Sequence, residues 1–212
     1  MPTGTLSAAQ VADPDMKRAI DLLISCTALV VLSPVLLIVG ILILITSGRP
    51  ILFLQDRPGR GGRTFRLIKF RTMTRTESTE VDTETDGSRL TRLGRILRAT
   101  SLDELPELWN VLRGDMSLVG PRPLLTEYLP LYTPEQARRH EVRPGITGWA
   151  QVNGRNAVDW ETRFQLDTWY VDNRTLLLDF LILFKTIYQV VRIDQTRSPG
   201  HQTQEKFRGS QQ

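Results

Sequence analysis

The sequence is poor in the residues that build disulfides and zinc sites. Its 212 residues include one cysteine, Cys26, and two histidines, His140 and His201. A single cysteine forms no intramolecular disulfide, which excludes a disulfide-stabilised secreted scaffold. The two histidines lie far apart in the chain and match no zinc-binding spacing. Neither a cysteine-rich nor a histidine-rich metal centre is therefore expected.

A strong excess of charge of one sign is also absent. The chain has 27 Lys and Arg against 23 Asp and Glu, a net charge of +4. An excess this small does not indicate a nucleic-acid-binding protein. The length suits one compact domain with an accessory element and is too short for two large domains.

What the chain does have is a long apolar run near its N-terminus. Residues Ala19 to Ile45 contain a single ionisable side chain, Asp21. At about 1.5 Å per residue in a helix, the run is long enough to cross a hydrocarbon core of about 30 Å. It exceeds the apolar core of a cleaved signal peptide, usually about 7–15 residues, and no small-residue cleavage site follows it. We therefore predict a membrane segment that the mature protein retains.

The centre and the flanks of this segment decide its path. Pro34 removes one helical hydrogen bond and predicts a kink, and the hydroxyl of Ser33 is available to a freed carbonyl. The positive-inside rule places the C-terminal side in the cytoplasm and favours the same side for the N-terminal end. Two topologies stay open: a single kinked span, or a re-entrant hairpin bent at Ser33 and Pro34. The flanking cations are Lys17, Arg18, Arg49, Arg57, Arg60, Arg63, Arg66, Lys69, Arg71 and Arg75.

The region after the membrane segment alternates between ordered and polar stretches. Apolar runs over Ile51–Gln55 and Thr64–Phe70, separated by a glycine-rich turn, predict a β-hairpin. An acidic, threonine-rich stretch over Glu77–Asp86 predicts a solvated loop. A basic amphipathic helix is predicted next, of the kind that commonly faces lipid headgroups. Its residues are Arg89, Leu90, Arg92, Leu93, Arg95, Leu97 and Arg98.

A second apolar stretch, Leu176–Ile193, lies near the C-terminus. Asp179, Lys185 and Arg192 interrupt it, so it predicts a helix in the membrane interface or packed on the core, and not a spanning helix. Residues 1–15 and 200–212 are polar and without periodicity, which predicts flexible tails.

Residues suited to catalysis are densest over Ser101–Pro123. Asp103 and Glu104 are adjacent carboxylates at a predicted helix start. That start is either Ser101, with a capping-box pattern, or Asp103, which puts Pro106 in the first turn. Either register leaves Asp103 at the positive end of a helix, where a carboxylate stays ionised. Helix capping alone would also account for the pair.

Cations from three predicted elements accompany these carboxylates. Lys69 lies on a predicted strand, Arg98 on the basic helix, and Arg122 in a loop that Pro121 and Pro123 make stiff. Cations around an ionised carboxylate suit a phosphorylated substrate, usually with a divalent metal that offsets like charges.

The region Arg143–Asn156 forms a third group. Gly148–Val152 predicts a short strand, and Asn153 with Gly154 a tight hairpin turn. The tryptophan of this region either stacks on a nucleotide base or fills the core. Three residues here and in the helix predicted over Phe164–Asn173 are further candidates for substrate contacts: Trp149, Arg155 and Asp167.

Taken together, three motifs resemble the bacterial sugar transferase family, the monotopic phosphoglycosyl transferases that begin the assembly of surface glycans. The resemblance runs from about Met16 to Ile193, and the motifs are KFRTM, TSLDELPELWNVLRGDMSLVGPRP and RPGITGWAQVNGRN. Small members of the family consist of the catalytic module alone, and this chain resembles that form.

The resemblance implies a transfer in two steps. Asp103 would attack the sugar-proximal phosphate of a nucleoside diphosphate sugar, usually UDP-linked, forming a covalent phosphosugar enzyme and releasing UMP. Polyprenyl phosphate would then accept the phosphosugar. Glu104 would assist Asp103 in binding Mg²⁺ or handle protons. The residues implied to bind phosphates are Lys69, Arg98 and Arg122, with weaker motif matches at Arg155 and Asp167.

The implied fold is α+β and mainly helical, with a re-entrant membrane helix, interfacial amphipathic helices and a small β-hairpin. The family bends its membrane helix at a Ser-Pro pair, which Ser33 and Pro34 reproduce. The expected location is the cytoplasmic face of the bacterial inner membrane. Expected partners are a UDP-sugar, polyprenyl (undecaprenyl) phosphate and the bilayer, without nucleic acid. The expected parts are tails at 1–15 and 200–212, the re-entrant helix at 16–46 and the cytoplasmic catalytic domain at 47–199.

Two other functions fit parts of the sequence. A non-enzymatic protein that binds anionic lipid or polymer at the membrane surface would use the basic helix but leave Asp103 and Glu104 without a role. A phosphohydrolase would cleave the same donor with water as acceptor. The motifs identify the phosphates and the nucleotide more than the hexose, so the sugar stays open, as does the oligomeric state.

Overall fold

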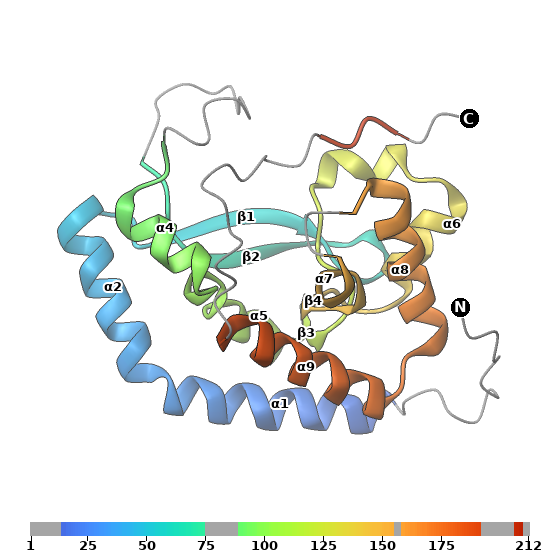
Figure 1. The fold of residues 1–212 in the computed structure, drawn as a ribbon, viewed down its shortest axis with the longest axis horizontal. Coiled ribbons are helices and arrows are strands. Elements are labelled where there is room, and N and C mark those ends of the chain that lie inside the picture. Colours follow the sequence, from blue (N-terminus) through green and yellow to red (C-terminus); the bar gives the residue numbers. More distant parts are fainter. Residues whose placement is uncertain (1–13, 75–88, 155–157, 192–205, 210–212) are drawn as a thin grey trace.

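The chain folds into short helices around two small sheets (Figure 1). A computed structural model describes residues 14–74, 89–154, 158–191 and 206–209. The predicted loop at Glu77–Asp86 lies outside these residues. In chain order the helices and strands are α1 (Pro14–Val31), α2 (Ser33–Ser47), β1 (Leu52–Pro58), β2 (Thr64–Phe70), α4 (Arg92–Ala99), α5 (Glu107–Arg113), β3 (Ser117–Val119), α6 (Pro134–Ala137), β4 (Gly145–Thr147), α7 (Trp149–Asn153), α8 (Trp160–Asn173) and α9 (Leu176–Val191).

The N-terminal apolar run forms two helices that meet at an angle. α1 runs beside α9 along one side of the molecule, and α2 turns away from it by 60° (Figure 1). The break predicted at Ser33 and Pro34 is confirmed, and the Ser33 hydroxyl donates to the carbonyl of Val30 at 2.7 Å. Within the described residues, no single helix is long and apolar enough to cross a membrane, whereas the bent pair meets both criteria. α1 begins at Pro14, inside the stretch predicted as a flexible tail, residues 1–15.

Polar side chains tie the first turns of α1 to the rest of the protein. Lys17 pairs with Asp179 of α9 at 2.5 Å. Arg18 donates to the carbonyls of Val111 and Leu112 in the last turn of α5, at 2.7 and 3.0 Å. Asp21, 4% exposed, accepts the Leu118 N–H of β3 at 3.2 Å. The start of the helix pair is thus fixed to the same domain into which α2 leads.

The predicted β-hairpin is confirmed as β1 and β2, with Leu52 opposite Phe70. Asn110 of α5, fully buried, continues the hydrogen bonding at the other edge of β2. Its side-chain oxygen accepts the Ile68 N–H at 3.1 Å, and its amide donates to the Arg66 carbonyl at 2.8 Å. A side-chain amide carries both a donor and an acceptor, so it can replace a strand neighbour. This contact fixes β2 relative to α5.

Three apolar clusters hold the elements together. The largest lies between β2, α5, β3, α7, α8 and α9, and a second packs α2 against β2 and α4. In the third, Phe207 is 5% exposed against Tyr128 and Phe164. The sequence predicted a flexible tail over 200–212, and this buried aromatic contact departs from that prediction.

The strand predicted at Gly148–Val152 and the hairpin turn at Asn153–Gly154 are wrong. The strand in this region is β4, which ends at Thr147 and pairs in parallel with β3. Gly148 then ends the extended backbone, and α7 follows from Trp149. The cause is tertiary packing, because α7 packs against α8 and α9 and buries Ala150 and Val152 there.

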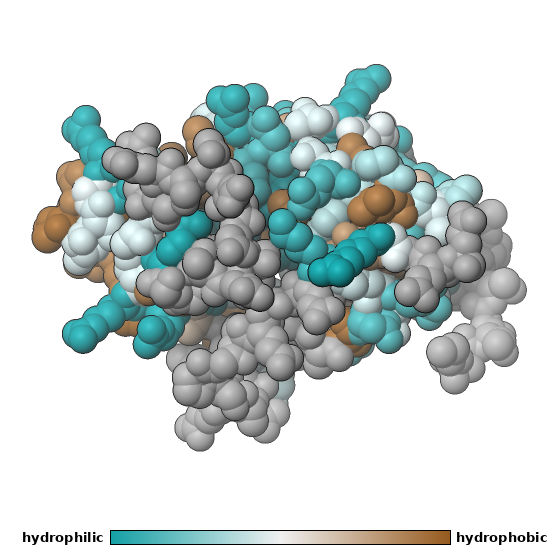
Figure 2. Space-filling model, turned by 90° about the horizontal axis from the view of Figure 1, so that it is seen from above, coloured by the Kyte–Doolittle hydropathy of each residue, from teal (hydrophilic) through white to brown (hydrophobic). Residues whose placement is uncertain are grey.

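Large apolar side chains remain exposed on α2 and α9. α9, as predicted, is a helix that packs on the core, burying Asp179 and Ile182. Figure 2 shows hydrophobic residues beside hydrophilic ones at the edge of the molecule where α2 lies in Figure 1. An apolar surface of this extent is unusual for a soluble monomer. The exposed residues are Leu37, Ile38, Ile41, Leu42, Leu44 and Ile45 on α2, and Leu177, Phe180, Leu181, Phe184, Ile187, Tyr188 and Val191 on α9.

Gly94 permits the close approach of α4 to the chain that follows β2. A Cβ atom on Gly94 would lie 2.0 Å from the Thr72 carbonyl oxygen. We predict that Gly94→Ala displaces α4 and lowers the free energy of unfolding by about 1–3 kcal/mol. Thermal unfolding of the purified protein in detergent measures the change. The neighbouring exposed residue gives the control, Arg95→Ala, and equal melting temperatures for the two variants would contradict the prediction.

Candidate active site

The segment between α4 and α5 carries the carboxylate pair on a tight turn. Ser101 has φ 58°, the one positive φ of a non-glycine residue in the described chain. Leu102–Glu104 then form a 3₁₀ turn, and α5 begins at Glu107 behind Pro106. Both predicted helix starts are therefore wrong. Pro106 caps α5 from outside, where its missing N–H removes no helical hydrogen bond.

Glu104 brings together cations from two separate elements. Its Oε1 atom lies 2.8 Å from Nζ of Lys69, on β2, and 2.5 Å from Nη2 of Arg122, in the loop after β3. Burial would raise the pKa of Glu104, but the charges of Arg122 and Lys69 hold it well below its usual range. Glu104 is therefore ionised at neutral pH, while 40% of the Arg122 side chain stays exposed.

Asp103 lies next to this ion cluster but outside it. Its residue is 8% exposed, and in the described part of the chain its carboxylate makes no hydrogen bond or ion pair. Burial raises the pKa of Asp103, and the charge of Glu104 adds to this, whereas Lys69, Arg98 and Arg122 oppose it. The sequence predicted a carboxylate kept ionised by a helix dipole. The structure gives a 3₁₀ turn and a raised pKa, which the charges of Lys69, Arg98 and Arg122 offset only in part.

Arg98 reaches the same region from the last turn of α4. Its Nε donates to the Thr72 hydroxyl at 3.0 Å, and its charge lowers the pKa of Asp103. The structure therefore brings together five of the predicted site residues, namely Lys69, Arg98, Asp103, Glu104 and Arg122.

Glu107 is a member of the cluster that the sequence analysis missed. It is 2% exposed, and its Oε1 lies 3.0 Å from Nζ of Lys69. Burial raises its pKa to about 7, although Lys69 opposes the shift. Its position in the sequence gave no clear signal, because its partner Lys69 lies on β2, far away in the chain.

The remaining predicted residues lie elsewhere. Trp149 stacks on Trp169 of α8 with ring centroids 5.0 Å apart, the packing role that the sequence had left open. Asp167 is 2% exposed and pairs with Arg139 at 2.8 Å, behind the loop of Arg122. Arg155 lies outside the described residues.

The carboxylates of the site suit a metal only in combination with a substrate. The described chain holds no cluster of three or more histidine, cysteine, aspartate or glutamate side chains arranged for a metal ion. Mg²⁺, however, is commonly held by one or two carboxylates together with substrate phosphates. Asp103, with no ion pair to a described residue, and the neighbouring Glu104 fit that donor set.

Comparison with known proteins assigns the chain to a family. The sequence model described as bacterial sugar transferase matches residues 12–193. The chain belongs to the bacterial sugar transferase family. It is therefore an enzyme, and the interpretation of the basic helix as the centre of a non-enzymatic lipid-binding protein is not supported.

Several relatives are similar over most of this chain. The uncharacterized sugar transferase EpsL of Bacillus subtilis is 50% identical over 195 residues, which are 92% of this chain and 96% of EpsL. The undecaprenyl-phosphate galactose phosphotransferase of Salmonella typhimurium is 40% identical over 84% of this chain and 41% of its own length. The UDP-N-acetylgalactosamine-undecaprenyl-phosphate N-acetylgalactosaminephosphotransferase of Aeromonas hydrophila is 41% identical over 83% and 44%. The chain spans less than half the length of these two phosphotransferases.

The raised pKa of Glu107 predicts a pH-dependent stability. Between its ordinary value, 4.5, and about 7, the folded protein retains a proton at Glu107 that the unfolded chain has released. The stabilisation from this group is therefore lost as the pH rises through that range. Glu107→Gln mimics the protonated form, so its stability relative to wild type should increase from about pH 5 to pH 8, by at most about 3 kcal/mol.

Thermal unfolding of both proteins across this pH range measures the difference. His140, whose pKa burial lowers to about 4, changes stability in the opposite sense, but it is present in both proteins and cancels. A difference in stability that does not vary with pH would contradict a titrating Glu107.

Proposed function

We propose that this enzyme transfers a phosphosugar from a UDP-sugar to a polyprenyl phosphate through a covalent intermediate on Asp103. One observation carries the proposal: Asp103 is a carboxylate without an ion pair to any described residue, beside Glu104, which binds both Lys69 and Arg122. A carboxylate that is not neutralised by a direct cation partner keeps its oxygen lone pairs for attack on phosphorus.

The first step forms the intermediate. A carboxylate oxygen of Asp103 attacks the phosphorus that carries the sugar, and the bond from this phosphorus to the bridging oxygen of the diphosphate breaks. That oxygen leaves with the bonding electron pair as part of UMP. In the second step an oxygen of polyprenyl phosphate attacks the same phosphorus, and the Asp103 oxygen leaves. The carboxylate is regenerated, and the product is a polyprenyl diphosphate sugar.

The cations lower the barrier to bringing anions together. Arg122 keeps exposed N–H groups for a donor phosphate, and Lys69 and Arg98 add positive charge around Asp103. Glu104 holds two of these cations at fixed places, so they need no reorganisation when charge moves onto the leaving phosphate. Neither step needs a general base, because the attacking and leaving groups are already anionic and no proton is transferred.

Mg²⁺ is part of this proposal as a cofactor. Asp103 and Glu104 would hold it together with the donor phosphates, where it would offset negative charge on the diphosphate. The chain's own contribution is to keep Glu104 ionised, through the charges of Arg122 and Lys69.

We further propose that α1 and α2 form a re-entrant membrane segment on the cytoplasmic face of the bacterial inner membrane. Lys17, Arg18 and Asp21 bond the start of α1 to the domain that follows α2. A single span would carry these three charged side chains to the opposite side of the bilayer and break all their contacts, leaving the buried Asp179 without its ion-pair partner. This placement also keeps the catalytic domain at the height of the acceptor's phosphate.

The covalent step is tested with the donor alone. Incubation of wild type with UDP-sugars and Mg²⁺ should release UMP and add the mass of one phosphosugar to the intact protein. Asp103→Asn should show neither, with UMP release lowered by about 10³-fold or more. An exposed carboxylate on β1 provides the control, Asp56→Asn, which should behave as wild type. UMP release by Asp103→Asn at the wild-type rate would remove Asp103 from its role.

The topology is tested by labelling single cysteines. In a Cys26→Ser background, Met16→Cys and Arg49→Cys place thiols at the two ends of the helix pair, both at exposed residues. A membrane-impermeant maleimide should modify both from the cytoplasmic side in inverted vesicles and neither in intact spheroplasts. Labelling of the two positions from opposite sides would establish a single span.

A further inference from the structure

A buried arginine lies directly behind the loop that carries Arg122. The side chain of Arg139 is 1% exposed. Its Nη2 donates to Oδ2 of Asp167 at 2.8 Å and to the carbonyl oxygen of Arg122 at 2.7 Å. Its Nε donates to the same Asp167 oxygen at 3.2 Å, and its Nη1 to the Tyr132 hydroxyl at 3.3 Å. One guanidinium therefore joins a helix, a loop and a 3₁₀ turn.

The loop has few other means of being held. Pro121 and Pro123 lack N–H groups, so the backbone on each side of Arg122 can be fixed mainly through its carbonyl oxygens. The Pro121 carbonyl accepts the Gly145 N–H at 3.1 Å. The Arg122 carbonyl accepts a hydrogen bond from Arg139. The side chain of Arg122 donates to Glu104, on the other side of the loop, at 2.5 Å.

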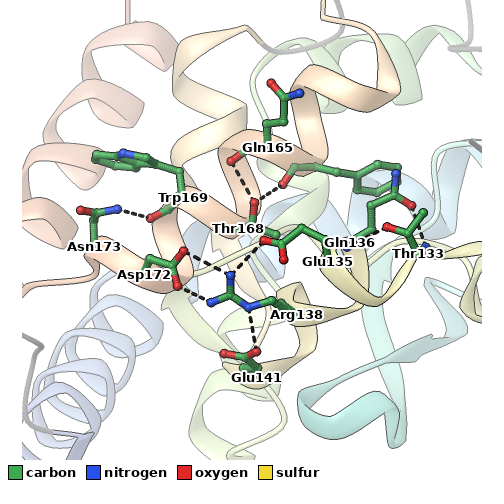
Figure 3. Close-up of polar contacts among 11 residues, drawn as sticks. Thr133, Glu135, Gln136, Arg138, Glu141, Gln165, Thr168, Trp169, Asp172 and Asn173 are labelled. Carbon is green, nitrogen blue, oxygen red and sulfur yellow. Dashed lines mark hydrogen bonds and ion pairs between the residues drawn. The ribbon is translucent and has the colours of Figure 1, made fainter. Parts of the chain in front are cut away.

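Arg138, on the same 3₁₀ turn as Arg139, makes ion pairs at the protein surface. Arg138 bonds three carboxylates, those of Glu135, Glu141 and Asp172 (Figure 3). Its side chain is 33% exposed and, among the described residues, forms no hydrogen bond or ion pair with the loop of Arg122. Exposed pairs of this kind contribute little to stability and nothing to the position of the site.

A buried pair behaves differently. Removing an arginine and an aspartate from water is costly, and an apolar pair of similar volume often serves stability as well or better. The hydrogen bond of Arg139 to the Arg122 carbonyl is what an apolar pair could not supply. The presence of a buried ion pair here is accounted for if the position of that carbonyl, and with it the Arg122 side chain, affects the reaction.

We propose that Arg139, oriented by Asp167, is a positioning residue that fixes Arg122 for the donor phosphate. This assigns Asp167 a supporting role at the back of the loop, in place of the direct substrate contact that the sequence suggested. The inference rests on the proposed function of Arg122 in binding phosphate. It adds two residues that act on the reaction without touching the substrate.

A double-mutant cycle tests the proposal. Arg139→Lys keeps a charge near Asp167 but cannot make all the hydrogen bonds of the guanidinium. We expect kcat/KM for the UDP-sugar to fall about 10- to 100-fold in a folded protein, because small displacements at a reacting centre have effects of this size. In an Arg122→Gln background, the same change should cost less than about threefold, since the side chain to be positioned is gone.

The matched control is Arg138→Lys, on the same turn, which should leave kcat/KM unchanged. Asp167→Asn, which keeps the shape of the partner, should reproduce part of the loss and be equally insensitive in the Arg122→Gln background. Circular dichroism and thermal unfolding of each variant confirm that folded proteins are compared.

If Arg139→Lys lowers kcat/KM by the same factor in the wild-type and Arg122→Gln backgrounds, the positioning role is overturned. The Arg139–Asp167 pair would then serve stability alone. Failure of both Arg139→Lys and Asp167→Asn to fold would overturn it for the same reason. Absence of UMP release by the wild-type enzyme in this assay would instead count against the proposed function itself.

Discussion

The site depends on a half-buried carboxylate, Glu104, that bridges Lys69 and Arg122. Without it, two cations would lie close together in a poorly hydrated region, and their repulsion would separate β2 from the loop after β3. With it, both cations are held at fixed places, and Lys69 has Glu107 as a second partner. Asp103, one residue earlier, lies close to their positive charge, which is the environment that the proposed attack on phosphorus requires.

The surrounding fold supplies these positions with very little sheet. β3 and β4 have three residues each, so regular strand pairing cannot fix the loops that follow them. Side chains substitute for missing strand neighbours instead: Asn110 bonds the edge of β2, and Arg139 bonds the Arg122 carbonyl. Buried polar residues of this kind reduce the tolerance of a core to substitution, because each removal leaves an unsatisfied backbone group.

The elements that were predictable from the sequence are those set by local pattern. The β1–β2 hairpin, the basic helix α4 and the bend at Ser33 follow from alternation, helical periodicity and proline chemistry within a few residues. Lys69, Asp103 and Arg122 were grouped because cations around a carboxylate suit a phosphorylated substrate, and the motif resemblance assigned the same residues to one site. Spacing alone does not reveal that they are neighbours in space.

The elements that were not predictable depend on distant partners. In the sequence, Glu107 is an ordinary acidic residue in the first turn of a helix, and only the fold brings Lys69 beside it. Asp167 likewise has no local partner, because its ion-pair partner Arg139 lies 28 residues away. Trp149 begins helix α7, which packs against α8 and α9, although the residues next to it in the sequence favour a strand. Phe207 is buried by aromatic rings from two separate segments, the turn of Tyr128 and α8. In each case tertiary contact overrides the local preference.

The polar contacts of α1 also have a consequence for how the protein is made. Lys17 is synthesised 162 residues before its partner Asp179. At about 5–20 residues per second, the ribosome takes roughly 8–30 s to cover that distance. During this time the apolar helix pair has left the ribosome, and the partners of Arg18 and Asp21 on α5 and β3 are made before the partner of Lys17. The docking of α1 is therefore a late event, completed when α9 packs, and a nascent chain arrested before α9 would lack the ion pair of Lys17.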